Sequence, residues 1–598
     1  MNTFLRDIAS YYIARYGKEI SDLCFVFPNK RAGVFFSHYV DEQATDAGFP
    51  LIHPAVVTIS DLIVDITDGI EASRIEQLFI LYRCYRDIVR EEKGTAEETV
   101  DFNKFQYWGE VLLGDFTDVD KYLVDPGEIF HNIEELKEIS ANYLTPEQIE
   151  VIKRYWGEDK VPAQIADFWN HAVHTGEVDS PKEKKSAIAF IKLWQVMYKL
   201  YNRFNDELSA RGLTYQGRMY KQALDTVRNM AADDFLYDKY VFVGFNVLST
   251  VEEKLFDTFK FKGKADFFWD YASPTFGNTD NRATTFLKKY VLRFPQPDDA
   301  AEIGRNVKEY PLIEVVGVPS VSGQTKIIGD IVEELVSENP TKPLLSTAIV
   351  LPDENLCLPM LNALPENINA INVTMGYPLR NTPVASLISL VISMQLRSRK
   401  YRFKDTFFHE DVIAVLSHPV IRSISSETCD AIARYIKEHR LFNVDRELLL
   451  SEEFRPLHRL FNITNDSNDQ HAVFSYLRNL VTWLLEEVNN RYKIEEIEED
   501  KELAIDVEQE ITLSASGAIE AGFLKHYLAS LDELERLRRK HLDDLDVDLT
   551  DGTVFHMVER LVSGESVSFE GRPLKGLQVM GVLETRALDF ENVIIASM

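Results

Sequence analysis

The chain has 598 residues, of which 45% are hydrophobic and 11% are aromatic. This length exceeds what one hydrophobic core supports, and the composition is that of a folded protein, so several packed domains are expected. The formal net charge of −31 disfavours a protein that coats itself in nucleic acid, because such binding rests on many lysine and arginine contacts to phosphate. An acidic exterior with a locally basic channel is still compatible with DNA binding, and acidity that serves solubility alone is the alternative.

The four cysteines are isolated from one another and form no CxxC pair: Cys24, Cys84, Cys357 and Cys429. This spacing is typical of a reduced, cytoplasmic protein and argues against a zinc ribbon or an iron–sulfur cluster within the chain. The N-terminus lacks the apolar core of a signal peptide, and no apolar run approaches the length of a membrane span. We therefore expect a cytoplasmic protein without a membrane partner.

The beginning of the chain alternates short apolar runs with helical patterns. Leu23–Phe27 predicts a buried strand, and Ala32–Val40 predicts a helix. Val56–Ile59 predicts a second strand, followed by a helix that Ser60 or Asp61 would cap. Alternation of this kind is typical of an α/β sheet with parallel strands.

A helical pattern interrupts this α/β region and is interpreted as an insertion over residues 91–220. Within it, Thr145–Gln148 has the sequence of a capping box with proline at the first helical position. Strands are expected again at Tyr240–Val243 and Ala265–Trp269. The first lobe would then consist of residues on both sides of the insertion.

A second α/β region follows a stretch with prolines and aspartates at 295–311, which predicts a domain boundary. It is expected to begin at Ile313–Val318 and to include a strand at Ser346–Leu351. After another helical stretch, strands return at Leu577–Met580 and Val593–Ala596. The last of these is expected to be buried, so the sequence is interpreted as ending within a sheet.

The first strand–helix junction lacks the groups that a nucleotide motor needs. A phosphate loop has the pattern G-x-x-x-x-G-K-[ST], whereas residues 27–36 read FPNKRAGVFF. Gly33 stands alone, and Lys30 precedes Arg31 rather than serine or threonine. A helix N-terminus with these two basic residues could bind an anion such as a DNA phosphate, and a solvated basic turn is the alternative.

The second motor motif is also incomplete, because a carboxylate that holds magnesium should end the strand. Here Gly244 and Phe245 end the strand at 240–243. Glu252 and Glu253 lie on the helix that follows, where acids in the first turn suit the helix dipole. Hydrolysis of ATP by this chain is therefore not expected.

The closing segment Leu577–Met598 resembles a stretch of superfamily 1 DNA helicases, in which a strand leads into T-x-H-x-x-K-G-L-E-F and then another strand. Four positions depart from that pattern: Gly581 replaces Thr, Leu583 replaces His, Arg586 replaces Lys and Ala587 replaces Gly. Leu588–Phe590 keeps the character of the closing L-E-F. The segment thus resembles a helicase scaffold that has lost its motor residues.

Four stretches together resemble the AddB/RecC-like branch of helicase–nuclease subunits: Val243–Phe245, Asn372–Ser386, Phe407–Ile421 and Val582–Phe590. The resemblance covers nearly the whole chain and is closer to AddB-like PD-(D/E)XK nuclease family proteins of the Bacteroides type. It implies an α/β fold with two RecA-like superfamily 1 helicase-type lobes, each interrupted by a helical insertion. The expected boundaries are 1–90 and 221–300 for the first lobe, 91–220 for its insertion, 311–398 and 561–598 for the second lobe, and 399–560 for its insertion.

In that family the helicase-like region, often inactivated, binds DNA at duplex ends or as a single strand, and a C-terminal nuclease domain cuts it. The partner is an AddA-like helicase–nuclease subunit, and the process is double-strand break processing for recombinational repair. No strand-borne aspartate with a following E-x-K or Q-x-K is found in this sequence. We therefore expect the nuclease, its magnesium and any iron–sulfur cluster to lie beyond residue 598.

Within the chain we expect no catalytic site, no cofactor and no metal. A channel between the two lobes would bind DNA through five basic residues: Lys30, Arg31, Arg380, Arg402 and Arg586. Two other interpretations stay open. The chain could be a protein-interaction scaffold that docks a partner helicase without binding DNA, or an active ATPase with divergent motifs that depends on Lys30.

Overall fold

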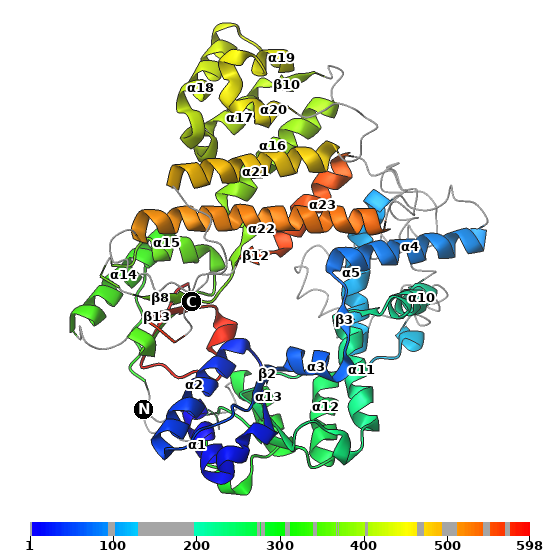
Figure 1. Ribbon diagram of the computed structural model, residues 1–598, viewed down its shortest axis with the longest axis vertical. Helices are drawn as coiled ribbons and strands as arrows, with labels where there is room; N and C mark the ends of the chain where they lie inside the picture. Colours follow the sequence, from blue (N-terminus) through cyan, green and yellow to red (C-terminus); the bar gives the residue numbers. More distant parts are fainter. Residues whose placement is uncertain are drawn as a thin grey trace, which may run out of the picture. The chain divides into compact units, whose positions relative to one another are not determined.

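The protein is described here by a computed structural model with a mixed α/β fold and parallel sheets (Figure 1). The residues that the structure describes are 3–93, 102–129, 197–271, 276, 282–304, 311–338, 344–365, 367–368, 370–400, 405–462, 472–492, 511–541, 551–567 and 574–597.

The chain divides into two compact units. The β1 unit comprises residues 11–33 and 47–307, and the β7 unit comprises residues 1–10, 34–46 and 308–598. The division passes within helices α1 (Phe4–Tyr16) and α2 (Lys30–Ala47). Among the described residues, every helix is too short or too polar to cross a lipid bilayer.

The β1 unit is built on a four-stranded parallel sheet of order β2-β1-β5-β6. Its strands are β1 (Leu23–Phe27), β2 (Ala55–Thr58), β5 (Lys239–Val243) and β6 (Ala265–Phe268). These bounds confirm the four strands predicted from the sequence to within one residue at each end. Every residue of β1 is buried, because β1 is a central strand with a neighbour on each edge.

Helices α3 (Ile59–Thr67), α12 (Thr250–Phe261) and α13 (Thr285–Arg293) belong to the same unit. They contribute to an aromatic core with β5 and β6, in which the rings of Phe242 and Phe256 lie 4.2 Å apart between centroids. Such ring pairs add to the free energy gained by burial. The predicted cap of α3 is corrected: Thr58 is the N-cap, and Asp61 completes a capping box by accepting the backbone N–H of Thr58.

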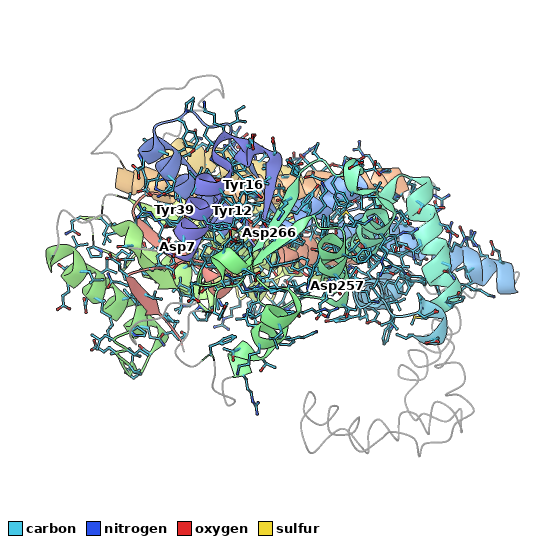
Figure 2. The ribbon with its side chains drawn as sticks, turned by 90° about the horizontal axis from the view of Figure 1, so that it is seen from below. Asp7, Tyr12, Tyr16, Tyr39, Asp257 and Asp266 are labelled. Carbon is cyan, nitrogen blue, oxygen red and sulfur yellow. The ribbon has the colours of Figure 1, made fainter. Side chains whose placement is uncertain are left out.

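One side chain of α1 is fixed at the amino ends of β5 and β6. Tyr12 and Asp266 are labelled in Figure 2, and the Tyr12 hydroxyl donates to Asp266 Oδ2 at 2.9 Å. Lys239 Nζ donates to Asp266 Oδ1 at 2.7 Å. Burial, followed by the Asp266 charge, raises the pKa of Tyr12 well above its ordinary value, so this hydroxyl is a structural donor.

Between α3 and β5 the described residues form mainly helices. They are α4 (Arg74–Lys93), α5 (Phe102–Lys121), α10 (Met197–Ala210) and α11 (Gln216–Asn229), with two short parallel strands, β3 (Ile70–Glu71) and β4 (Leu213–Thr214). Helix α4 packs on α5 and α10, and α11 packs on α5, α3 and α12. The capping box predicted at Thr145–Gln148 lies outside the described residues.

The β7 unit contains a second four-stranded parallel sheet, of order β14-β7-β13-β8. Its strands are β7 (Thr347–Val350), β8 (Ile371–Val373), β13 (Leu577–Met580) and β14 (Asn592–Ile595). Asn372 and Gln578 are both buried and form a side-chain hydrogen bond of 2.9 Å between β8 and β13. A shift in pairing would separate these polar groups inside the core, so the bond favours the observed register.

Two predictions for this unit are corrected. The strand expected to be buried at Val593–Ala596 is β14, which lies at the end of the sheet, and its Val593 and Ile595 side chains are 51% and 45% exposed. The segment Ile313–Val318, expected to begin the α/β region, belongs to none of the sheets in the described part of the chain.

The remaining helices of the β7 unit are α14 (Val321–Glu338), α15 (Cys357–Leu361), α16 (Pro383–Lys400), α17 (His409–Ser417), α18 (Pro419–Glu438), α19 (Arg446–Leu449), α20 (His458–Phe461), α21 (Ala472–Tyr492), α22 (Ile511–His541) and α23 (Asp551–Gly564). Those from α16 to α23 follow β8 and precede β13. Helices α21 and α22 lie side by side (Figure 1). Two short antiparallel sheets pair β10 (Thr406–Phe408) with β11 (Asn443–Asp445), and β9 (Tyr377–Pro378) with β12 (Ser566–Val567).

Candidate functional site

The carboxyl ends of β1 and β5 meet at the centre of the β1-unit sheet. The chain leaves β1 toward β2 on one side, and it leaves β5 toward β6 on the other side. In open parallel sheets, ligands bind in the crevice at such a switch point, where the loops after two neighbouring strands diverge. The two loops here are residues 28–29 and 244–249.

The junction between β1 and α2 is closed by the chain's own atoms. Asn29 Oδ1 accepts the backbone N–H of Ala32 at 2.8 Å, which satisfies one of the free donors at the start of α2. A Cβ atom on Gly33 would lie 2.9 Å from Cγ1 of Val56, so this glycine permits close packing of α2 on β2. Gly33, the single glycine of this junction, therefore has a packing role.

The junction between β5 and α12 is also occupied by local contacts. Gly244 has a φ of +72°, a left-handed conformation that favours glycine, and its N–H donates to Phe268 at 2.9 Å. Ser249 caps α12, and Glu252 accepts the Ser249 backbone N–H at 2.7 Å in a capping box. The carboxylate of Glu252 thus stabilises the helix start.

The second acid of α12, Glu253, is held by side chains of α13. Its carboxylate accepts from Lys289 and Arg293 at 2.5 Å each, and from the Tyr290 hydroxyl at 3.0 Å. Partial burial raises the pKa of Glu253. The hydrogen bonds from Lys289 and Tyr290 and the charges of the neighbouring cations lower it by more, so the pKa is below its ordinary value. Both glutamates that follow β5 therefore join structural contacts.

In the β7 unit, the segment that resembles a helicase motif continues from β13 into a short 3₁₀ helix, η11 (Val582–Thr585). Glu584 accepts a hydrogen bond from the Thr374 hydroxyl, which follows β8. Ala587, at the position where the helicases carry glycine, has a φ of +60°. Phe590 packs on the small core cluster of Ala348, Val350 and Met580, so it is a structural residue here.

The structure places the five predicted DNA-binding residues in different parts of the chain. Lys30 is exposed at the first position of α2 in the β1 unit, and its neighbour Arg31 is only 7% exposed. In the β7 unit, Arg380 is exposed on η8 (Leu379–Asn381), and Arg586 is half-buried after η11. Arg402 lies outside the described residues. Only Lys30 and Arg31 are brought side by side by one element.

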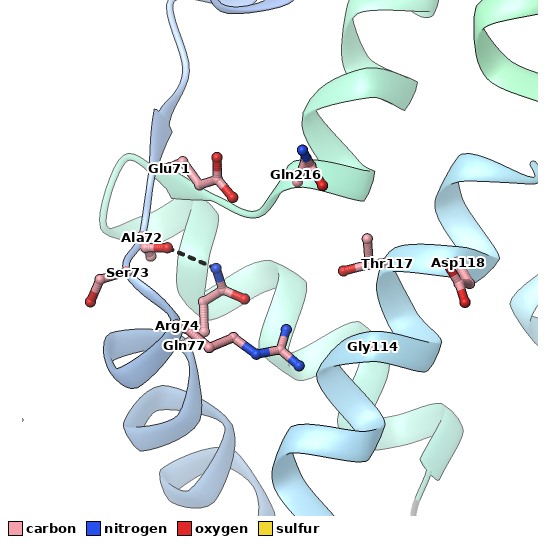
Figure 3. Close-up of a pocket in the computed structure, with 9 residues that line it drawn as sticks. All are labelled: Glu71, Ala72, Ser73, Arg74, Gln77, Gly114, Thr117, Asp118 and Gln216. Carbon is pink, nitrogen blue, oxygen red and sulfur yellow. Dashed lines mark hydrogen bonds between the residues drawn. The ribbon is translucent and has the colours of Figure 1, made fainter. Parts of the chain in front are cut away.

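Sequence reasoning did not identify a cavity of about 510 Å³ in the β1 unit (Figure 3). Residues from β3, α4, α5 and α11 and the turn between β3 and α4 line it: Glu71, Ala72, Ser73, Arg74, Gln77, Gly114, Thr117, Asp118 and Gln216. Gln77 is buried and donates from Nε2 to the Ala72 carbonyl at 2.7 Å. No short motif could have identified the cavity, because its walls come from segments far apart in the sequence.

Most of the residues that line the cavity have polar side chains, and these carry both signs of charge. Arg74 donates from Nη2 to the Glu110 carbonyl at 2.7 Å. Partial burial raises the pKa of Glu71, against the opposing effects of the Lys121 charge and a backbone hydrogen bond at Gln216. Lys121 Nζ also donates to Gln216 Oε1 at 2.7 Å. Such a wall suits a small polar ligand, but no arrangement in it selects one chemical class.

A buried carboxylate fixes the helices that form this wall. Asp120 on α5 is fully buried and accepts from the hydroxyls of Tyr201, at 2.7 Å, and Tyr215. Lys221 Nζ donates to it at 3.1 Å. Burial and the contact with Asp120 raise the pKa of both tyrosines, so they remain neutral donors. The network joins α5 to α10 and α11 and is interpreted as structural.

Within the described ranges, no group of three or more His, Cys, Asp or Glu residues could hold a metal ion. The four cysteines are free and buried. Burial raises the pKa of Cys24, Cys84 and Cys357 to about 12, so these thiols are protonated and unreactive near neutral pH.

Comparison of the sequence with protein-family models and with curated proteins found no match.

Proposed function

We propose that this chain is the catalytically silent, helicase-like, DNA-binding part of an AddB-like helicase–nuclease subunit that acts in double-strand break processing and recombinational repair. The observation that carries the proposal is the β1–α2 junction. Where a motor would wrap phosphates with glycine-rich backbone, Asn29 caps the helix and Gly33 packs on Val56, while Lys30 is exposed. This arrangement leaves one exposed lysine at the start of the helix, without a triphosphate cradle.

The layout of the sheets supports a scaffold of two RecA-like lobes. Each unit has a four-stranded parallel sheet, and in each the described residues between two strands of that sheet are mainly helical. The φ of +60° at Ala587 is a second support, because L-residues rarely adopt this conformation and the helicases carry glycine at the matching position. The backbone there has the form that a glycine would favour, although the side chain has changed.

DNA binding is tested with the purified chain and two fluorescent DNAs, a blunt duplex and a single strand, by anisotropy over a range of salt concentrations. We expect binding at low salt that weakens as salt rises, because bound phosphates release counterions. Lys30→Glu should weaken binding and reduce the slope of log Kd against log salt by about 0.7–0.9 for a lost phosphate contact. No affinity for either DNA at low salt would refute the DNA-binding part of the proposal.

Lys18→Glu is the matched control for this substitution. Lys18 is exposed in the β1 unit on η1 (Gly17–Asp22), which leads into the amino end of β1, whereas Lys30 follows its carboxyl end. Both variants change the net charge equally, so a specific contact predicts a larger effect at Lys30. Equal effects would mean that Lys30 acts only through the overall field of the protein.

The proposed absence of ATP hydrolysis is tested separately by measuring phosphate release from ATP, with and without DNA. We expect no turnover by the wild-type chain. Turnover that disappears in Lys30→Ala would instead establish an ATPase with divergent motifs and would overturn this part without affecting the DNA-binding result.

The net charge of −31 favours one alternative, a scaffold that docks a partner helicase without contacting DNA. Co-purification with an AddA-like subunit distinguishes the two. A stable complex that forms while the isolated chain has no affinity for DNA would support the scaffold.

A further inference from the structure

The segment Pro311–Val318, with the sequence PLIEVVGV, belongs to no helix or strand and is mostly exposed despite its apolar character. The side chains of Leu312, Ile313 and Val315 are 98%, 74% and 89% exposed. Short continuous apolar runs of this kind are typical of strands within parallel sheets, and contiguous exposed apolar surface usually marks a surface that another segment covers. The segment therefore lacks the packing that its sequence predicts.

The connection from this segment to α14 has the same construction as the connection from β1 to α2. In each, a proline and a capping residue separate the last apolar residue from the helix: Pro319 and Ser320 before α14, Pro28 and Asn29 before α2. Ser320 Oγ accepts the N–H of Gly323 at 3.0 Å, and Asn29 Oδ1 accepts the N–H three residues further on at 2.8 Å. Because β1 precedes this connection in the first case, a strand is expected before it in the second.

An acceptor for such a strand exists in the same unit. Among the described strands, β14 pairs only with β7, so its outer edge is open, and its Val593 and Ile595 side chains are about half exposed. Beyond the end of β14, the Ser597 backbone N–H and hydroxyl contact Gln324 Oε1 at 2.9 Å and 3.1 Å. The first turn of α14 is thus fixed at the carboxyl end of β14.

We propose that residues 312–318 dock on the open edge of β14 as an additional parallel strand, which gives the sheet order 312–318, β14, β7, β13, β8. Because α14 begins at the carboxyl end of β14, the segment before it would run in the same direction as β14. The path from this strand through α14 to β7 is then an ordinary parallel crossover, for which a right-handed path is expected. Docking adds a hydrogen-bond ladder and closes an edge that could otherwise pair with another chain.

Hydrogen–deuterium exchange of the full chain tests the proposal against a synthetic peptide of residues 311–318. Docking predicts that the alternate amides of 313–318 that face β14 exchange at least about tenfold more slowly in the protein than in the peptide. Because only alternate N–H groups of an edge strand face its neighbour, one of the two substitutions Glu314→Pro and Val315→Pro removes a ladder donor, and that variant should make both this segment and β14 exchange faster. Val321→Pro is the matched control, because Val321 is the first residue of α14, a position where proline is tolerated.

Each other outcome overturns the proposal. Exchange of residues 313–318 at the peptide rate in the wild type would show that the segment is free. Protection that appears only at high protein concentration would mean that the β14 edge, or the segment, pairs with a second copy. Unchanged exchange of β14 in both Glu314→Pro and Val315→Pro would mean that the segment packs elsewhere. This experiment does not depend on DNA binding, so its result neither supports nor refutes the proposed function.

Discussion

Replacing Gly217 by alanine tests the packing of the two helices that hold the cavity. Gly217 is the second residue of α11, and a Cβ there would lie 2.5 Å from the carbonyl oxygen of Thr117 and 2.7 Å from its Cα. These are backbone atoms of α5 and cannot rotate away, so α11 has to move. Overpacking of this kind costs about 1–3 kcal/mol, whereas the better helix propensity of alanine returns at most about 1 kcal/mol. We expect a net loss of about 1–2 kcal/mol.

Gly114→Ala is the matched control, because Gly114 lines the same cavity on α5 and a Cβ there would have no atom within 4 Å. This variant should be more stable than the wild type by up to about 1 kcal/mol. Since a chain of two units need not unfold in one step, stability is best measured by urea unfolding with hydrogen exchange of α5 and α11 as the local probe. If Gly217→Ala proves as stable as Gly114→Ala, the contact between α11 and α5 is wrong.

Three further substitutions test the contacts of two carboxylates, Asp120 and Asp7, by urea unfolding. Asp120→Ala leaves two buried tyrosine hydroxyls without their acceptor and should lower the free energy of unfolding by about 3 kcal/mol. Lys221→Met should lower it by only about 1 kcal/mol, because the lysine side chain is 37% exposed in the wild type. Equal losses of unfolding free energy in the two variants would contradict this explanation. Partial burial and the Asp589 charge raise the pKa of Asp7 above 3.8, so the folded state binds this proton more tightly than the unfolded state. Stability from this group should therefore rise as pH falls from 7 toward about 4, and Asp7→Asn should flatten that part of the profile; an unchanged profile would exclude Asp7 as its source.

The strands of both sheets could be predicted because strands in parallel sheets are short, nearly continuous apolar runs between polar residues. Residues 23–27 and 577–580 carry this signal and fold as β1 and β13 with the predicted bounds. Burial is a different matter, because it depends on the order of strands in the sheet. Residues 593–596 are as apolar as β13, yet the Val593 side chain is about half exposed, because β14 lies at the end of the sheet.

The candidate sites show the same division between local and long-range information. The broken phosphate-loop pattern around Gly33 could be identified from neighbouring residues alone. The packing role of Gly33 could not be predicted, because its contact with Val56 depends on how α2 crosses β2. The cap of α3 was missed by two residues, since Thr58 both ends β2 and caps the helix. The cavity was missed because Glu71 and Gln216 meet only through the pairing of β3 with β4.

The cap at Asn29 and the contact at Gly33 do not oppose phosphate binding equally. A capping side chain contributes about 1 kcal/mol, so an anion that bound the start of α2 could displace Asn29. The contact of Gly33 with Val56 involves the position of the whole helix and cannot yield locally, so the backbone cannot wrap several phosphate groups. A single phosphate approached by the exposed Lys30 needs no such wrapping. Under the proposed function, the junction would therefore take one phosphate of a DNA strand rather than the triphosphate of a nucleotide.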